Sequence, residues 1–266
     1  EMFNTYSEYI DAQDGYDVTL TIDATIQSYL EKAIEEGIQD YAVQNGAFGI
    51  AMNPKTGEIL AIASSPDFDP NNYSLISDEI LNASIDTNAE TIYQQLKANN
   101  TENLTDEELR SQARGQAYNQ AVMAQWRSKA VNDTYEPGST FKAIVLSIAL
   151  EEGLVDESDT FTCTGGVKVD GYSDIIRCSK RTGHGTQTLA QAVQNSCNPA
   201  FIAIGQRLGV ERFYEYFQAF GYTEMTGVDL PSEAEGINWG SSMTNVDLAV
   251  ASFGQRFTTT PIQQIT

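Results

Sequence analysis

The chain has 266 residues, 41% of them hydrophobic, which is enough to bury a sizeable core in one or two domains. Its 37 acidic and 15 basic residues give a formal net charge of −22, which would repel phosphate backbones, so we expect no nucleic-acid partner. No apolar run approaches the roughly 18 to 20 residues that span a bilayer, and no signal peptide opens the chain. Because the chain starts at Glu1, we expect that an N-terminal piece precedes it.

The N-terminal segment is polar at first and then becomes patterned. Residues 1–16 carry scattered aromatics, and we interpret them as a linker or the end of a preceding domain. Residues 18–23 (VTLTID) alternate apolar and polar side chains, which predicts a strand. Asp23 can cap a helix over residues 24–44. The apolar stripe of that helix consists of Ile26, Leu30, Ile34 and Ile38.

Two short apolar runs follow, and a turn joins them. The runs FGIAM (48–52) and EILAIAS (58–64) are compatible with strands and show no helical stripe. In the connecting residues 53–57, Asn-Pro can start a turn and Gly57 can take a positive φ to close it. We therefore predict a β-hairpin with Lys55 exposed at its tip.

Residues 66–134 form a long polar stretch with weak helical patterning. Its clearest helical signal is DEELRSQARGQAYNQAVMAQW, which follows a candidate cap at Thr105. We interpret this stretch as a helical insertion over the surface.

The segment YEPGSTFKAIVLSIALEEG (135–153) combines a chain break with an apolar helix. Ser139 can open the helix after Pro-Gly, and Gly153 can end it. Lys142 follows Ser139 by three residues, so both side chains emerge on one helical face about one turn apart. The residues expected to bury one face of this helix are Phe141, Val145, Ile148 and Ala149.

This spacing suits a serine nucleophile that has no histidine base. A free hydroxyl needs a base within hydrogen-bond reach, and a lysine can be that base when its pKa is lowered. The helix N-terminus would also direct the Ser139 N–H toward an oxyanion. Ser-x-x-Lys alone is a weak pattern, but Glu-Pro-Gly before it and the apolar helix behind it strengthen it. Any Ser-His-Asp triad would depend on His184, the only histidine.

A second polar element lies at a break between helical stretches in QAVQNSCNPAFIAIG. There, Ser196 and Asn198 could place a hydroxyl and an amide against the Ser139–Lys142 pair. By itself, Ser-x-Asn is a common loop tripeptide.

All three cysteines and the lone histidine fall within one window: Cys163, Cys178, His184 and Cys197. Three thiolates and an imidazole are the ligand set of a closed tetrahedral zinc site, although the intervals are not those of a zinc finger. One alternative is a Cys163–Cys178 disulfide with Cys197 free. Another is three buried thiols and a surface histidine.

Taken together, these segments resemble a class B penicillin-binding protein, whose first two motifs match YEPGSTFK and NSCNPAF in order and approximate separation. Further family-like pieces are VTLTID, NPKTGEILAIASSPDFDPNNY, TGVDLPSE and FGQRFTTTPIQQ. The resemblance implies an α/β (α+β) penicillin-binding-protein/serine β-lactamase-like fold, with an antiparallel sheet, flanking helices and a helical subdomain. It covers residues 17–266 as a transpeptidase domain.

In that family the active-site Lys-Thr-Gly follows Ser-x-Asn on a late strand. Lys55-Thr56-Gly57 precedes the nucleophile, so it matches the early hairpin and not the third motif. We therefore expect the domain to be incomplete at its C-terminus and, as given, weakly active or inactive.

The resemblance also implies roles and surroundings. Ser139 would be acylated by a peptidoglycan stem peptide or a β-lactam, with Lys142 as base, Ser196 as proton relay and Asn198 holding Lys142 and the substrate amide. Some members carry a zinc beside the Ser-x-Asn loop. The full-length protein would be membrane-anchored on the extracytoplasmic face and work with a glycan-polymerising partner of division, elongation or sporulation. The alternatives are a serine β-lactamase, a β-lactam sensor, or a non-catalytic fragment.

Overall fold

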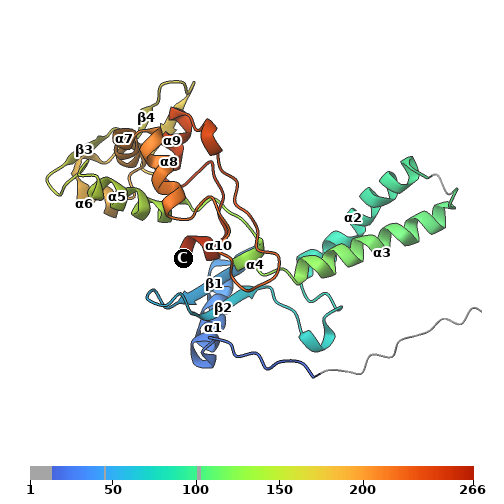
Figure 1. Cartoon of the computed structure of the whole chain (residues 1–266). Helices are drawn as coiled ribbons and strands as arrows, with labels where there is room; N and C mark the ends of the chain where they lie inside the picture. Colours follow the sequence, from blue (N-terminus) through green and yellow to red (C-terminus); the bar gives the residue numbers. More distant parts are fainter. Residues whose placement is uncertain (1–13, 45, 101–102) are drawn as a thin grey trace, which may run out of the picture.

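The structure is a computed structural model that describes residues 14–44, 46–100 and 103–266. Most of the predicted linker, residues 1–16, therefore lies outside the described residues. Figure 1 shows three parts: a lobe built around α5 to α9, a smaller unit in which α1 lies beside β1 and β2, and a helical hairpin that projects from the rest.

The smaller unit is a two-stranded antiparallel sheet with a helix against it. Helix α1 (Ala24–Tyr41) begins where the Asp23 carboxylate accepts the N–H groups of Thr25 and Ile26, which confirms the predicted cap. Strands β1 (Ala47–Met52) and β2 (Ile59–Ser65) form the predicted hairpin. A Cβ on Gly49 would lie 2.6 Å from Leu30 Cδ1, so this glycine lets α1 approach the sheet closely.

The strand predicted over residues 18–23 is wrong. These residues have no strand assignment, and Val18 and Leu20 are 82% and 71% exposed. The segment touches β2 through single hydrogen bonds, from Thr21 Oγ1 to Ile59 O and from Asp23 N to Leu60 O. Alternation of side chains is not sufficient for a strand, because a strand also needs a hydrogen-bonded ladder.

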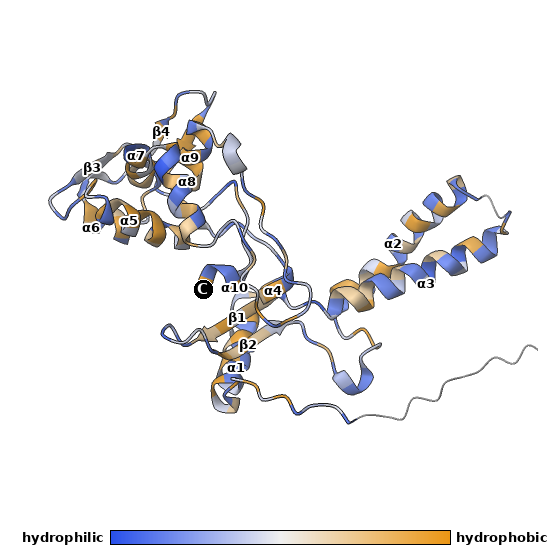
Figure 2. Ribbon diagram, viewed as in Figure 1, coloured by the Kyte–Doolittle hydropathy of each residue, from blue (hydrophilic) through white to orange (hydrophobic). Residues whose placement is uncertain are grey.

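The projecting hairpin consists of α2 (Glu79–Ala98) and α3 (Asp106–Gln125). Thr105 and Glu108 form a capping box at the start of α3, as the sequence predicts. The two helices share a core of their own, made of Ile85, Ile92, Tyr93, Leu109, Ala113, Ala117 and Ala121. Hydrophilic residues cover much of the remaining surface of both helices in Figure 2.

The large lobe contains the remaining strands and most of the remaining helices. Its elements are η2 (Gly138–Phe141), α5 (Lys142–Glu151), β3 (Thr160–Cys163), β4 (Gly166–Lys168), β5 (Ile175–Arg177), β6 (Gly185–Thr188), α6 (Leu189–Gln194), α7 (Asn198–Leu208), α8 (Val210–Ala219), η3 (Gly240–Ser242) and α9 (Asn245–Ala251). Strand β3 pairs with β6 and β4 with β5, both antiparallel. The core lies between α5, α7, α8 and α9, and it includes the four residues predicted to bury one face of the nucleophile helix.

Two short helices and a 3₁₀ turn complete the description: η1 (Pro70–Asn72), α4 (Lys129–Asn132) and α10 (Pro261–Ile265). Val131 of α4 and Ile262 of α10 are buried in one cluster with residues of β1 and β2, which fastens the end of the chain to the smaller unit. No helix in the described ranges is both long enough and apolar enough to cross a membrane.

Candidate active site

Ser139 lies on a 3₁₀ turn that runs directly into α5. Its side chain is exposed, whereas Lys142, the first residue of α5, is only 4% exposed. Between them Phe141 is fully buried among aromatic rings, with centroid distances of 4.8 Å to Phe257 and 5.2 Å to Tyr222. The buried phenylalanine therefore fixes the turn, so that the serine faces outward and the lysine inward.

Ser196 occupies a helix-ending turn in an unusual conformation. It follows the end of α6 with φ of 47°, in the left-handed region that glycine normally takes. The N–H of Ser196 donates to Val193 O at 2.9 Å and that of Cys197 to Ala192 O at 3.0 Å, the two bonds of a Schellman motif. Helix α7 then starts at Asn198, so one tight turn orients both polar side chains.

The four predicted catalytic side chains converge on one point. Lys142 Nζ lies 3.1 Å from Ser139 Oγ, 2.8 Å from Ser196 Oγ and 2.8 Å from Asn198 Oδ1. The Ser196 hydroxyl donates to Ser139 Oγ at 2.9 Å, and Asn198 Nδ2 donates to the carbonyl of Arg177 at 3.1 Å. Ser139 Oγ therefore has both a lysine amine and a second hydroxyl within proton-transfer distance.

Burial increases the fraction of Lys142 that is neutral. Desolvation of its ammonium lowers the pKa of Lys142 to about 8, compared with 10.5 for an ordinary lysine. With this pKa, about a tenth of the molecules carry a neutral lysine at pH 7, far more than for an ordinary lysine, and a neutral amine can accept the proton of Ser139.

A distant segment holds the nucleophile turn (residues 135–139), a contact that the sequence analysis missed. In the return segment (residues 254–259), Gly254 O accepts the N–H of Gly138 at 2.8 Å, and the N–H of Arg256 donates to Glu136 Oε1 at 2.8 Å. Gly254 has φ of 83°, and a Cβ there would lie 1.9 Å from Gly138 O. The run FGQRFTTTP contained this glycine, but no local pattern links it to a turn more than a hundred residues earlier.

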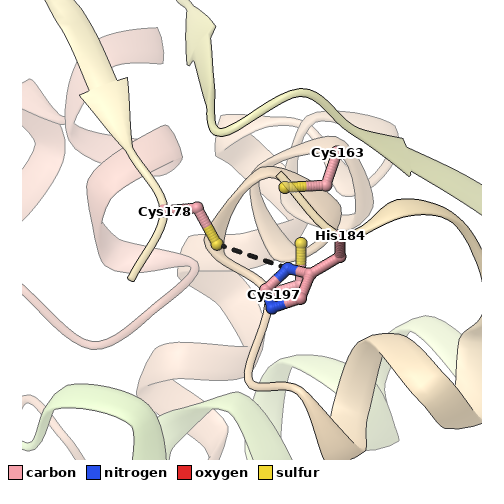
Figure 3. Close-up of side chains that lie close together, drawn as sticks. All are labelled: Cys163, Cys178, His184 and Cys197. Carbon is pink, nitrogen blue, oxygen red and sulfur yellow. Dashed lines mark hydrogen bonds between the residues drawn. The ribbon is translucent and has the colours of Figure 1, made fainter. Parts of the chain in front are cut away.

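The candidate metal ligands also come together (Figure 3). The ligand atoms of Cys163, Cys178, His184 and Cys197 all lie within 4.8 Å of one another. Cys163 ends β3, Cys178 directly follows β5, and Cys197 is the residue between Ser196 and Asn198. All three cysteines are buried free thiols, so the structure contains no Cys163–Cys178 disulfide.

The donor chemistry fits a thiophilic cation. Burial raises the pKa of the Cys197 thiol to about 12, so this sulfur would ionise near neutral pH only beside a cation. For Cys178, burial opposes ionisation, but hydrogen bonds from the backbone N–H groups of Lys180 and Asn198 bring the pKa below its ordinary value. Cys178 Sγ also lies 3.7 Å from His184 Nδ1.

Comparison with known proteins identifies the family of this site. Residues 47–266 match the model of the penicillin binding protein transpeptidase domain. The chain belongs to that family. Among curated proteins, it is 36% identical over 260 residues to stage V sporulation protein D of Bacillus subtilis and 30% identical over 263 residues to the peptidoglycan D,D-transpeptidase MrdA of Acinetobacter baumannii. These relatives support the assignment of this transpeptidase domain to the class B penicillin-binding proteins.

The two alignments cover 97% and 95% of this chain but 33% of each relative, so the chain spans about a third of their length. Two solved structures share the fold. PBP2 of Pseudomonas aeruginosa has a TM-score of 0.62 at 23% identity, over 93% of this chain and 50% of that one. A peptidoglycan glycosyltransferase from Burkholderia ambifaria has a TM-score of 0.64 at 19% identity, over 92% of this chain and 58% of that one. The predicted fold class is thereby confirmed.

The early Lys-Thr-Gly lies on the hairpin tip. Lys55 and Gly57 are exposed on the turn between β1 and β2, where Gly57 has φ of 74° and its N–H donates to Asn53 O at 2.9 Å. The structure therefore presents Lys55 to solvent on a turn and not along a strand, as the sequence predicts.

Proposed function

We propose that this domain belongs to a D,D-transpeptidase that cross-links peptidoglycan stem peptides through an acyl-enzyme on Ser139. The observation that carries the proposal is the placement of Ser139 Oγ within 3.1 Å of Lys142 Nζ and 2.9 Å of Ser196 Oγ. The names of relatives such as the peptidoglycan D,D-transpeptidase MrdA support the substrate class.

Each polar side chain has a role in this reaction. As Ser139 Oγ attacks the carbonyl carbon of the penultimate D-Ala, Lys142 accepts the hydroxyl proton. The peptide C–N bond then breaks, and the terminal D-Ala leaves after its amine receives a proton through Ser196. An amine of a neighbouring stem peptide attacks the ester, and Ser139 regains its proton. Asn198 keeps Lys142 in position and offers its amide to the substrate backbone.

Penicillin tests the nucleophile directly, because a β-lactam mimics the D-Ala-D-Ala bond. Mass spectrometry of the penicillin-treated full-length gene product should find the adduct on the peptide that contains Ser139, and Ser139→Ala should abolish it. An adduct that survives this substitution would refute the assignment. Absence of any adduct would favour the non-catalytic alternative.

Nitrocefin separates the transpeptidase from a serine β-lactamase. A transpeptidase gives a burst close to one equivalent, because its acyl-enzyme hydrolyses slowly, whereas a β-lactamase turns the reagent over continuously. The match of residues 47–266 to the transpeptidase domain supports the burst.

We propose further that Cys163, Cys178, His184 and Cys197 hold a structural zinc ion. The convergence of the four ligand atoms within 4.8 Å supports this, as does the closed, largely buried set of three sulfurs and one imidazole. Bound there, zinc would supply a cross-link between the Ser196–Asn198 turn and strands β3 and β5. It would take no part in proton transfer.

Peptidoglycan is built outside the cytoplasmic membrane, so we place the active domain on the extracytoplasmic face of the bacterial cell. There the full-length protein would be membrane-anchored and would work beside a glycan-polymerising partner, because cross-linking needs newly made strands. Fractionation of cells that express the full-length gene product tests the location.

A further inference from the structure

One segment that contributes to the candidate active site has no acidic residues, although the chain as a whole is acidic. The chain carries 37 acidic residues, yet none lies between Asp174 and Glu211. This interval includes three of the four candidate metal ligands (Cys178, His184 and Cys197) and the whole Ser196–Asn198 turn. It also contains Arg177, Lys180 and Arg181 within five positions.

The two arginines of this group differ from all the others. The chain has eight arginines, and all lie in described ranges. Six form ion pairs with described carboxylates: Arg110, Arg114, Arg127, Arg207, Arg212 and Arg256. Arg177 and Arg181 form none with any described residue, and the same holds for Lys180. In a protein of net charge −22, arginines without carboxylate partners next to an active site point to an external anion.

The backbone holds Arg177 beside Asn198, and it fixes the loop that carries Lys180 and Arg181. Arg177 ends β5, and its carbonyl accepts Asn198 Nδ2 at 3.1 Å. The loop that follows is packed tightly, because a Cβ on Gly165 would lie 1.9 Å from the carbonyl oxygen of Arg181. The N–H of Gly183 also donates to Lys180 O at 2.9 Å. All three basic side chains are exposed. Rigid backbone with exposed cations is the arrangement expected of a pre-organised anion subsite.

We propose that Arg177, Lys180 and Arg181 form a subsite for a carboxylate on the acyl-donor peptide. The inference rests on the proposed function and names a feature of the substrate for the same site. Stem peptides carry free carboxylates away from the bond that is cleaved, so a donor strand lying along Asn198 would bring one near Arg177. The subsite lies next to Asn198, the residue proposed to bind the substrate amide, because the Arg177 carbonyl accepts Asn198 Nδ2.

A matched pair of penicillins tests this subsite. Carbenicillin differs from benzylpenicillin by one carboxylate on the side chain, which occupies the acyl-donor side. The measured quantity is the acylation rate constant of carbenicillin divided by that of benzylpenicillin, both determined with the full-length gene product. In the triple variant R177Q/K180Q/R181Q, this ratio should fall about three- to tenfold, the effect expected when three exposed charge interactions are lost together. Benzylpenicillin itself should react within about twofold of wild type, which shows that Ser139 and its neighbours are intact.

Two controls make the result specific. The variant K32Q/K55Q/R114Q removes the same charge at other exposed positions and should leave the ratio unchanged. For the wild type, the ratio should fall toward that of the triple variant as salt rises from about 20 to 300 mM, because exposed charges are screened over about a Debye length. This salt test needs no variant, so it decides the matter even if the triple variant fails to fold.

The outcomes separate the two proposals. If benzylpenicillin acylates Ser139 but the ratio is unchanged in the triple variant, or if the wild-type ratio does not respond to salt, the subsite is refuted and the proposed function stands. If neither penicillin acylates the protein, the proposed function fails and the subsite fails with it. If the ratio falls equally in the control variant, the change in net charge alone explains the effect, and the subsite is also refuted.

Discussion

Lys142 Nζ lies 2.8 Å from Asn198 Oδ1, although the two residues are 56 positions apart in the chain. Lys142 is only 4% exposed, and this burial lowers its pKa to about 8. Because the neutral amine is the form that accepts a proton, we predict that acylation by benzylpenicillin speeds up as pH rises. Below the pKa, the rate constant should increase about tenfold per pH unit, and it should level off above about pH 8. A flat profile between pH 6 and 9 would contradict the role of Lys142 as base.

We predict that Ser196→Gly separates stability from catalysis. Glycine adopts the left-handed φ of 47° without the conformational cost that serine bears. The free energy of unfolding should therefore stay the same or increase by up to about 1 kcal/mol, and the melting temperature should not fall. Acylation should nevertheless fall at least about tenfold, because the hydroxyl next to Ser139 is lost. Ser196→Ala is the matched control, since it loses the hydroxyl and keeps the strained backbone. If the wild type and both variants are acylated at equal rates, the Ser196 hydroxyl takes no part in acylation.

We predict that Gly254→Ala damages the nucleophile turn. The new Cβ would meet the backbone of Gly138 at 1.9 Å, so the turn would have to move, at a cost of more than about 3 kcal/mol of unfolding free energy. Thermal unfolding and the penicillin acylation rate should both fall. Gly221→Ala is the control, because Gly221 has a similar φ of 81° and a Cβ added there would meet open space. This substitution should lower the free energy of unfolding by no more than about 1 kcal/mol. Equal effects of the two substitutions would mean that the contact with Gly138 is unimportant.

We predict that protein purified without added metal contains close to one equivalent of zinc. Structural zinc contributes directly to folding free energy, so chelation should lower the melting temperature. Cys197→Ser and His184→Ala should each lower both zinc content and melting temperature. Val193→Ala changes an exposed residue just before the same turn, and it should alter neither. Less than about half an equivalent of zinc, together with a Cys163–Cys178 disulfide in the peptide map, would refute the metal site.

We predict that Lys55→Ala leaves acylation within about twofold of wild type. Lys55 is exposed on the turn between β1 and β2, and surface substitutions usually change stability by less than about 0.5 kcal/mol. By contrast, Lys142→Ala in the otherwise wild-type protein should abolish acylation on the time scale of the assay. Loss of labelling in the Lys55 variant would show that the hairpin tip takes part in the site.

Local patterns predicted the parts of this molecule that local interactions build. The caps at Asp23 and Thr105, the β1–β2 turn and the buried face of α5 all depend on neighbouring residues, and all are confirmed. The strand expected at residues 18–23 failed because its ladder would have to come from elsewhere in the chain. The packing of the return segment on the nucleophile turn is equally non-local, and the left-handed Ser196 breaks the usual preference for glycine at that position. Single-sequence patterns carry no signal for either feature.

The return segment also has a consequence for the order in which the site can form. The hydrogen bond between Arg256 and Glu136 joins residues 120 positions apart, and the paired backbone of Tyr135 and Thr259 closes a loop of similar length. Contacts of such long range close late, because loop-closure entropy must be overcome first. While the protein is being made, Ser139 and Lys142 therefore emerge together on η2 and the start of α5 long before the contacts that hold the serine turn are complete. In the nascent chain, the turn that carries Ser139 therefore stays incomplete until residues 254–259 have been synthesised and have packed against it.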